Sequence, residues 1–315
     1  MFENNRLVQE AKAVERTPRG FFLLLQILMI FMIFLLFGLP FIFAEEQINS
    51  LSRTLFRDSQ LVSSIEFALM PLATVLVAIA VAVYVRVFER RPLRQVGFSH
   101  PHRTPRFVRG FAIGAGSVAV IAACASLVGL GSIDNSGLVV SGASVLPYLP
   151  IFLVAWVIQG TSEEIFTQGW LMPKAVRTFG PGIGVGLSSA VFSLLHLWND
   201  GMGPLPLVNL LLFGLFGAGL ALYEEGISGI AGYHAAWNFA YCNLFGFPIS
   251  GSEGDTSFVR IVLEEHLLAG SSFGPMGGLL ATFLLLVQLG IVGLLLKRKH
   301  CASKRTTTTS LDCIL

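Results

Sequence analysis

Five polar residues inside apolar segments are the part of this sequence that could carry out chemistry. The stretch QGTSEEIFTQGWLMPK holds two adjacent carboxylates, Glu163 and Glu164, and apolar sequence continues after them. His196 follows in FSLLH, and His234 and Asn238 follow in HAAWN, four residues apart. Ionisable side chains inside a membrane segment are costly and are functional candidates by default. We therefore take these five residues as the candidate catalytic set.

These residue types can hydrolyse an acyl bond in two ways. In the first, Glu163 takes a proton from water, while His234 and Asn238 share one helix face and donate hydrogen bonds to a developing oxyanion. In the second, Glu163, His196 and His234 hold a divalent metal such as zinc, with water in the open position. A neutral amide is a poor zinc ligand, so Asn238 favours the first mechanism. The sequence contains neither HExxH nor GxSxG.

Structural roles compete with this interpretation. A lone histidine in a membrane helix is more often a packed, hydrogen-bonded residue than a catalyst. Glutamate pairs at the ends of apolar runs are usually interfacial, and we interpret three pairs in this way: Glu45/Glu46, Glu224/Glu225 and Glu264/Glu265.

The composition predicts an all-α polytopic membrane protein. Of the 315 residues, 54% are hydrophobic and only 13% are charged, and the mean hydropathy is +0.72, whereas soluble domains carry about a quarter charged residues. A helix needs about 20 apolar residues to cross a bilayer. Eight stretches qualify as spans: 21–44, 62–85, 110–130, 145–173, 182–199, 204–223, 226–249 and 275–296. No basic block suggests nucleic acid, and the four cysteines lack metal or redox spacing.

The distribution of basic residues predicts that both termini are cytoplasmic. Of the 21 Lys and Arg residues, all but Arg53, Arg57 and Arg260 fall in the two tails and in the loops on one side of the eight spans. We expect a multi-pass protein of a bacterial cell membrane. Its expected parts are a cytoplasmic tail (1–20), three spans with a basic loop (21–144), a catalytic core (145–249), an external loop (250–274), a last span (275–297) and a disordered cytoplasmic tail (298–315).

Depth along the spans indicates that the candidate residues form one site. At a rise of about 1.5 Å per residue, Glu163 lies about 16 Å, His196 about 21 Å and His234 about 12 Å from the cytoplasmic ends of their spans. Three separate helices therefore place polar groups in one layer, between the cytoplasmic face and the bilayer middle.

The motifs EEIFTQG, FSLLH and HAAWN resemble, in this order, the three motifs of the CPBP family, which comprises type II CAAX prenyl endopeptidases and Abi or bacteriocin-processing proteins. The family pattern is Glu-Glu-x-x-x-Arg, then Phe-x-x-x-His, then His-x-x-x-Asn or Asp. The resemblance implies peptide hydrolysis within the membrane by members commonly called metalloproteases. It makes Glu163 the water-activating residue, Glu164 its supporting neighbour, and His196, His234 and Asn238 the residues of the later motifs.

One position departs from the family pattern. Gln168 stands near where the arginine of the first motif is expected. Glutamine keeps hydrogen-bond donors but lacks the fixed charge and the bidentate fork of arginine. The expected role of this position as a carboxylate anchor is therefore open.

The predicted function is an intramembrane endopeptidase that acts on membrane-associated peptides or proteins, including prenylated or bacteriocin-like ones. The bilayer is the expected environment, and nucleic acid is not an expected partner. One alternative is a self-immunity or regulatory membrane protein with little catalysis. Another is a proton-coupled transporter, which would also use membrane glutamates and histidines, although no internal repeat is evident.

Overall fold

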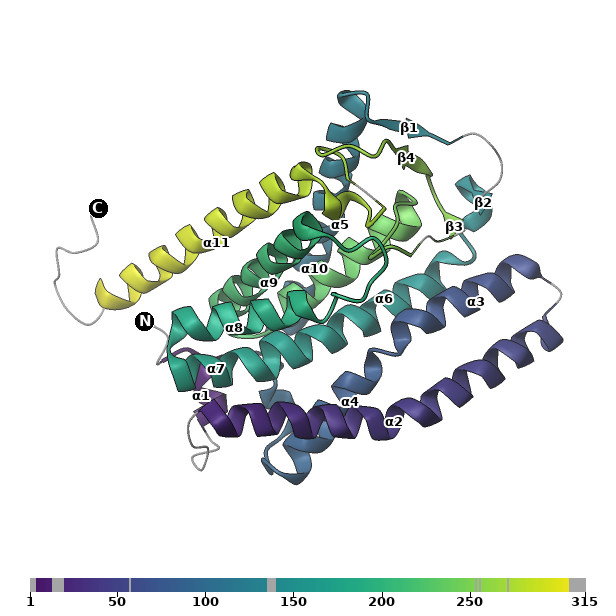
Figure 1. The fold of residues 1–315 in the computed structure, drawn as a ribbon. Coiled ribbons are helices and arrows are strands. Elements are labelled where there is room, and N and C mark those ends of the chain that lie inside the picture. The colour runs from purple at the N-terminus through teal and green to yellow at the C-terminus, as the bar shows by residue number, and fades with distance from the viewer. Residues whose placement is uncertain are drawn as a thin grey trace.

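The computed structural model describes residues 4–12, 20–56, 58–134, 140–252, 254, 256–270 and 272–305. Within these ranges, long helices lie side by side, and four short strands gather at one end of the bundle, which we call the strand end (Figure 1). The helices are α1 (Arg6–Lys12), α2 (Gly20–Leu55), α3 (Ser59–Leu72), α4 (Val75–Val87), α5 (Arg103–Leu127), α6 (Leu149–Glu164), α7 (Met172–Phe179), α8 (Pro181–Leu194), α9 (Pro204–Glu224), α10 (Ser228–Phe239) and α11 (Leu279–Arg305). The strands are β1 (Gly131–Ile133), β2 (Val140–Ser141), β3 (Thr256–Ser257) and β4 (Ile261–Leu263).

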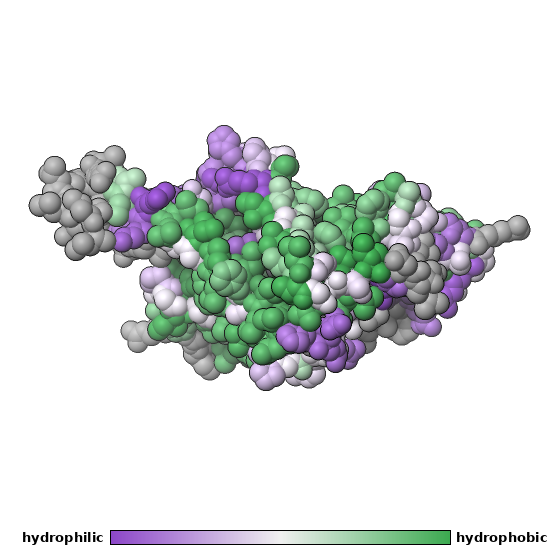
Figure 2. All heavy atoms as spheres, turned by 90° about the horizontal axis from the view of Figure 1, so that it is seen from above, coloured by the Kyte–Doolittle hydropathy of each residue, from purple (hydrophilic) through white to green (hydrophobic). Residues whose placement is uncertain are grey.

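The helical membrane class is confirmed. In the described part of the chain, four helical segments are long and apolar enough to cross a bilayer: Arg103–Leu127, Leu149–Phe179, Pro204–Glu224 and Leu279–Ala302. Three shorter apolar helices accompany them: Leu23–Leu36, Val75–Val87 and Pro181–Leu194. Figure 2 shows a broad apolar area over the middle of one face, with hydrophilic residues around it. The number of eight spans and the cytoplasmic termini stay predictions.

The predicted spans do not all form single helices over their full length. The second, 62–85, is divided between α3 and α4, which are separated by a break at Ala73 and Thr74. Pro71 lies two residues before this break and cannot donate a backbone hydrogen bond. In the fifth, 182–199, α8 ends at Leu194, so that His196 lies in the following turn and not within a helix.

The structure adds detail at the two ends of the last predicted span. The predicted external loop 250–274 contains β3 and β4, which pair with β2 and β1 respectively. At the other end, α11 continues to Arg305. The predicted disordered tail 298–315 therefore begins inside this helix, and residues 306–315 lie outside the described residues.

Helix α10 forms the centre of the bundle, and all of its residues are buried. Glycines bring it very close to α5. A Cβ atom added to Gly110 would lie 1.9 Å from the carbonyl oxygen of Gly229, and one added to Gly114 would lie 2.3 Å from that of Tyr233. Small residues permit such close packing of membrane helices. This packing fixes the position of α10, which carries two of the candidate residues.

A buried ionic cluster joins α2 and the segment after α4 to the helical segment Leu149–Phe179, which also carries Glu163 and Glu164. Glu89 forms ion pairs with Lys174 and Arg91, and both partners are almost fully buried. The indole of Trp170 donates to Glu89 at 3.0 Å, and Lys174 donates to Gln26 at 2.6 Å. Burial opposes the ionisation of Glu89, but Lys174 and Arg91 outweigh it, so that the pKa of this carboxyl lies below its ordinary value.

We expect Lys174→Met to lower the free energy of unfolding by about 3–5 kcal/mol, because it removes one partner of a buried ion pair. The exposed pair of Lys299 and Glu225 supplies the control, and Lys299→Met should cost at most about 1 kcal/mol. Denaturant unfolding in detergent measures both. Because the pKa of Glu89 is lowered in the folded state, the pair stabilises at neutral pH and its contribution fades as the pH falls through that pKa. Equal losses in the two variants would contradict a structural role for the cluster.

Candidate active site

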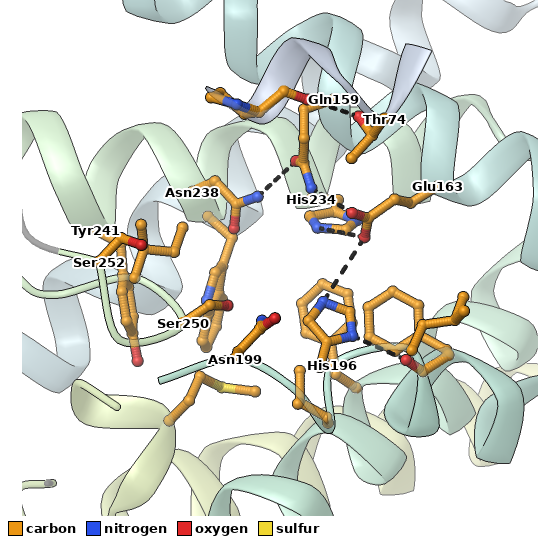
Figure 3. A pocket seen from close by; sticks show the side chains of 18 of the residues that line it. Thr74, Gln159, Glu163, His196, Asn199, His234, Asn238, Tyr241, Ser250 and Ser252 are labelled. Carbon is orange, nitrogen blue, oxygen red and sulfur yellow. Dashed lines mark hydrogen bonds and ion pairs between the residues drawn. The ribbon is translucent and has the colours of Figure 1, made fainter. Parts of the chain in front are cut away.

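The structure brings all five predicted residues together. Figure 3 shows Glu163, His196, His234 and Asn238 around the cavity. Glu163 and Glu164 end α6, and His234 and Asn238 lie on one face of α10. His196 enters from the turn after α8. A π-helical segment, Ile165–Leu171, follows the carboxylates directly, and such segments occur frequently at functional sites.

Glu163 has one oxygen that is held and one that faces the two imidazoles. Its Oε1 atom accepts a hydrogen bond of 2.6 Å from Nε2 of Gln159. Its Oε2 atom lies 3.9 Å from Nε2 of His196 and 3.9 Å from Nε2 of His234. This second oxygen is buried and has no hydrogen-bond partner among the described residues. Its lone pairs are therefore free for a water molecule or a substrate.

Hydrogen bonds fix which nitrogen of each imidazole faces Glu163. Nδ1 of His196 lies 2.8 Å from the carbonyl oxygen of Phe192, which can only accept, so Nδ1 carries the proton. This carbonyl is free because α8 ends here and the amide of His196 donates instead to Ser193. A second bond of 2.9 Å joins Nδ1 of His234 to Oε1 of Glu164. Both Nε2 atoms consequently point at the pocket.

The adjacent carboxylates face different neighbours. Successive residues of a helix point about 100° apart, and Glu163 turns to the pocket while Glu164 turns to α10. Glu164 is almost fully buried, with 1% of its surface exposed. It contacts His234 directly, whereas the sequence predicted that it would support Glu163, and its role stays a prediction.

Gln159 is a site residue that the sequence analysis did not select. It accepts from Nδ2 of Asn238 at 2.8 Å and donates to Glu163, so that three side chains form one chain of hydrogen bonds. The orientation of both amide groups follows from the carboxylate at the end of this chain of hydrogen bonds, because an ionised carboxylate only accepts. The available signal was a polar residue in a membrane span four positions before Glu163, which places both on one helix face.

Gln168 does not contact the carboxylates. It is buried beside α8 and α9, where its Nε2 lies 3.4 Å from the carbonyl oxygen of Gly214 and its Oε1 lies 3.4 Å from Oγ of Ser188. Both contacts are long for hydrogen bonds. At this position the chain has a packing residue between helices.

The polar groups lie at the inner end of a cavity of about 510 Å³. Aromatic side chains form much of its wall, including Trp156, Phe213 and Trp237. Phe213 packs edge-on against His234 with ring centroids 5.1 Å apart. Thr74, from the break between α3 and α4, also lines the cavity near Gln159 (Figure 3).

The donor set has the chemistry of a zinc site but not its spacing. Each histidine has its second nitrogen hydrogen-bonded, as metal-ligating histidines usually do. In a tetrahedral zinc site with bonds of about 2.1 Å, however, ligand atoms lie about 3.4 Å apart, and here Glu163 Oε2 is 3.9 Å from each nitrogen. Among the described residues, no group of three or more His, Cys, Asp or Glu is arranged to hold a metal ion.

Residues 145–240 match the family model described as type II CAAX prenyl endopeptidase Rce1-like. This match supports membership of the CPBP family for this segment. The segment contains all five predicted residues together with Gln159, and the resemblance of the three motifs is thereby confirmed. The family indicates a protease that acts on membrane-associated peptides. No curated protein and no solved structure matches the chain.

We expect Gln159→Leu to lower kcat by about a hundredfold, because misplacing a catalytic group by about 1 Å can cost this much. The variant removes the donor to Glu163 and the acceptor of Asn238. Gln168→Leu is the matched control, since it removes a buried glutamine from the same helical run without touching either residue. Steady-state kinetics of both proteins, with unfolding curves, measure the difference. Equal kcat values in the two variants would exclude the positioning role of Gln159.

Proposed function

We propose that this protein is an intramembrane endopeptidase in which Glu163 activates water for attack on a peptide carbonyl. The observation that carries this proposal is the free Oε2 atom of Glu163, which faces two imidazole Nε2 atoms at 3.9 Å inside a cavity. One water molecule could hydrogen-bond to Glu163 and to one imidazole at once, at about 2.8 Å each. The match to an endopeptidase family supports the same reaction class.

In the first step, water attacks the carbonyl carbon while Oε2 of Glu163 takes one of its protons. Nε2 of His196 accepts a hydrogen bond from the other hydrogen of this water and so orients the nucleophile. The carbonyl π electrons move to oxygen, which gives a tetrahedral oxyanion. In the second step, the oxyanion collapses and the C–N bond breaks. Glu163 returns its proton to the leaving nitrogen, so the products are a carboxylic acid and an amine.

Asn238 and His234 are placed to stabilise the oxyanion. Asn238 uses one N–H of its amide for Gln159 and keeps the second for the substrate. His234 donates through Nε2 when its ring is an imidazolium, and Glu164 then supplies the opposite charge at Nδ1. Donors fixed in this way before the reaction stabilise charge strongly in a site of low dielectric constant.

The cavity wall favours apolar residues beside the cleaved bond, because Trp156, Phe213 and Trp237 are in reach of it. A membrane-associated peptide, whether prenylated or bacteriocin-like, fits this requirement. A self-immunity protein with little catalysis would not require the hydrogen bond between Gln159 and Glu163, or two imidazoles that face Glu163.

We expect Glu163→Gln to lower kcat by about 10²–10⁴-fold, because it removes the general base while keeping the shape of the side chain. Its thermal stability should hold or rise, since a costly buried charge is lost. Glu164→Gln should lower kcat less, because Glu164 acts through His234. Full activity of the Glu163→Gln protein on a membrane-anchored peptide would remove Glu163 from the role of base.

The role of a metal is tested separately. If His234 and Asn238 stabilise the oxyanion, His234→Ala and Asn238→Ala should each lower kcat by about 10²–10³-fold with little change in KM. Activity should also survive chelation of the purified protein. One equivalent of zinc that is lost together with activity, and that is absent from His234→Ala protein, would instead establish the metal mechanism.

A further inference from the structure

The cavity leads from Glu163 to loops at the strand end of the bundle. Its outer rim is formed by the turn after α8 and by the loop after the π-helical segment Ala240–Leu244 that extends α10. Trp198 and Asp200 on this rim are exposed, and Ser250 is half-buried. A solute at this end therefore meets an open, partly polar entrance.

In the opposite direction, toward α7, tightly packed residues block the way. Trp170 and Leu171 on one side, and Ile227 and Ile230 on the other, are completely buried. The backbones also approach closely there, because a Cβ atom added to Gly169 would lie 2.6 Å from the carbonyl oxygen of Val96. Glu163 is thus closed from the end that holds α1 and the last turns of α11 (Figure 1).

The position of Gln288 along α11 indicates the depth of the site in the membrane. Tyr233, the neighbour of His234, donates to Oε1 of Gln288 at 2.8 Å. Gln288 lies nine residues after Leu279 and nine before Lys297, or about 13–14 Å from each. The catalytic layer is therefore near the middle of the bilayer.

The rim lies at the level where α11 begins. Nδ2 of Asn209, near the start of α9, donates to the carbonyl oxygens of Met276 and Gly278 just before α11, at 2.7 and 3.1 Å. The turn after α8 leads into α9 only five residues earlier. The cavity thus spans one half of the bilayer, from the catalytic layer to the boundary at the strand end.

Charge identifies that boundary. Among the described residues, the segments at the strand end carry only Arg53 and Arg260 of the chain's Lys and Arg residues. Cytoplasmic loops carry the excess of basic residues, so the strand end is the non-cytoplasmic one.

We propose that water and substrate reach Glu163 from the non-cytoplasmic side of the membrane. The substrates are accordingly membrane-anchored or exported peptides whose cleavage site lies in the outer half of the bilayer. Apolar residues next to the cleaved bond contact the aromatic wall, and polar residues follow at the rim. The cleavage itself rests on the proposed function, whereas the side of access does not.

The test measures accessibility to a membrane-impermeant thiol reagent, a charged methanethiosulfonate. The four native cysteines are replaced by alanine, and Ser250→Cys is introduced; Ser252→Cys is a second rim variant in case the first fails to fold. Arg94→Cys, exposed in the segment after α4, is the control for the opposite side. Right-side-out and inverted vesicles are labelled in parallel.

We expect the rim cysteine to react only in right-side-out vesicles and Arg94→Cys only in inverted ones. Cleavage of a membrane-anchored reporter peptide should fall at least tenfold after the rim is modified and stay unchanged after modification of Arg94→Cys. A rim cysteine that reacts in inverted vesicles would overturn the proposed access. Labelling does not require catalysis, so the two proposals can fail separately. If the rim cysteine is labelled from outside but the protein cleaves neither an outward-facing nor an inward-facing reporter, the endopeptidase function is refuted and the access route stands.

Discussion

Two carboxylates in the interior of a membrane bundle must be held by donors, and the site follows from how this chain meets that requirement. Unpaired buried charge is costly, so each glutamate has a dedicated partner: Gln159 for Glu163 and His234 for Glu164. The compensation is incomplete at one atom. Oε2 of Glu163 has no hydrogen-bond partner among the described residues and faces two imidazoles, and for this reason we propose that it takes a proton from water.

The adjacency of the two glutamates explains why one helix can serve two functions. Neighbouring residues on a helix face different directions, so Glu163 lines the cavity while Glu164 is packed against α10. In contrast, residues four positions apart place their side chains on the same face of a helix. Gln159 with Glu163 and His234 with Asn238 follow this rule, and their two pairs meet in the bond from Asn238 to Gln159.

The sequence was sufficient to select five candidate residues that lie together in the structure, because ionisable groups stand out in apolar helices. It was less informative where tertiary contacts decide. Gln159 is neutral and matches no family motif, so only its contacts reveal its role. The break between α3 and α4 arises in a stretch where hydropathy stays high and gives no signal. The short strands depend on pairing between segments more than a hundred residues apart, as Gly131 with Leu263.

The placement of His234 and Asn238, the proposed oxyanion donors, depends on glycine. Gly114 and Gly160 let α5 and α6 approach α10 at Tyr233 and His234, and a methyl group at Gly160 would lie 3.2 Å from the imidazole of His234. Enlarging such a residue would shift His234 against Glu163 without changing any catalytic group. In the proposed mechanism, helix packing sets the geometry of the site, because the base belongs to α6 and the oxyanion donors belong to α10, and these two helices pack against each other.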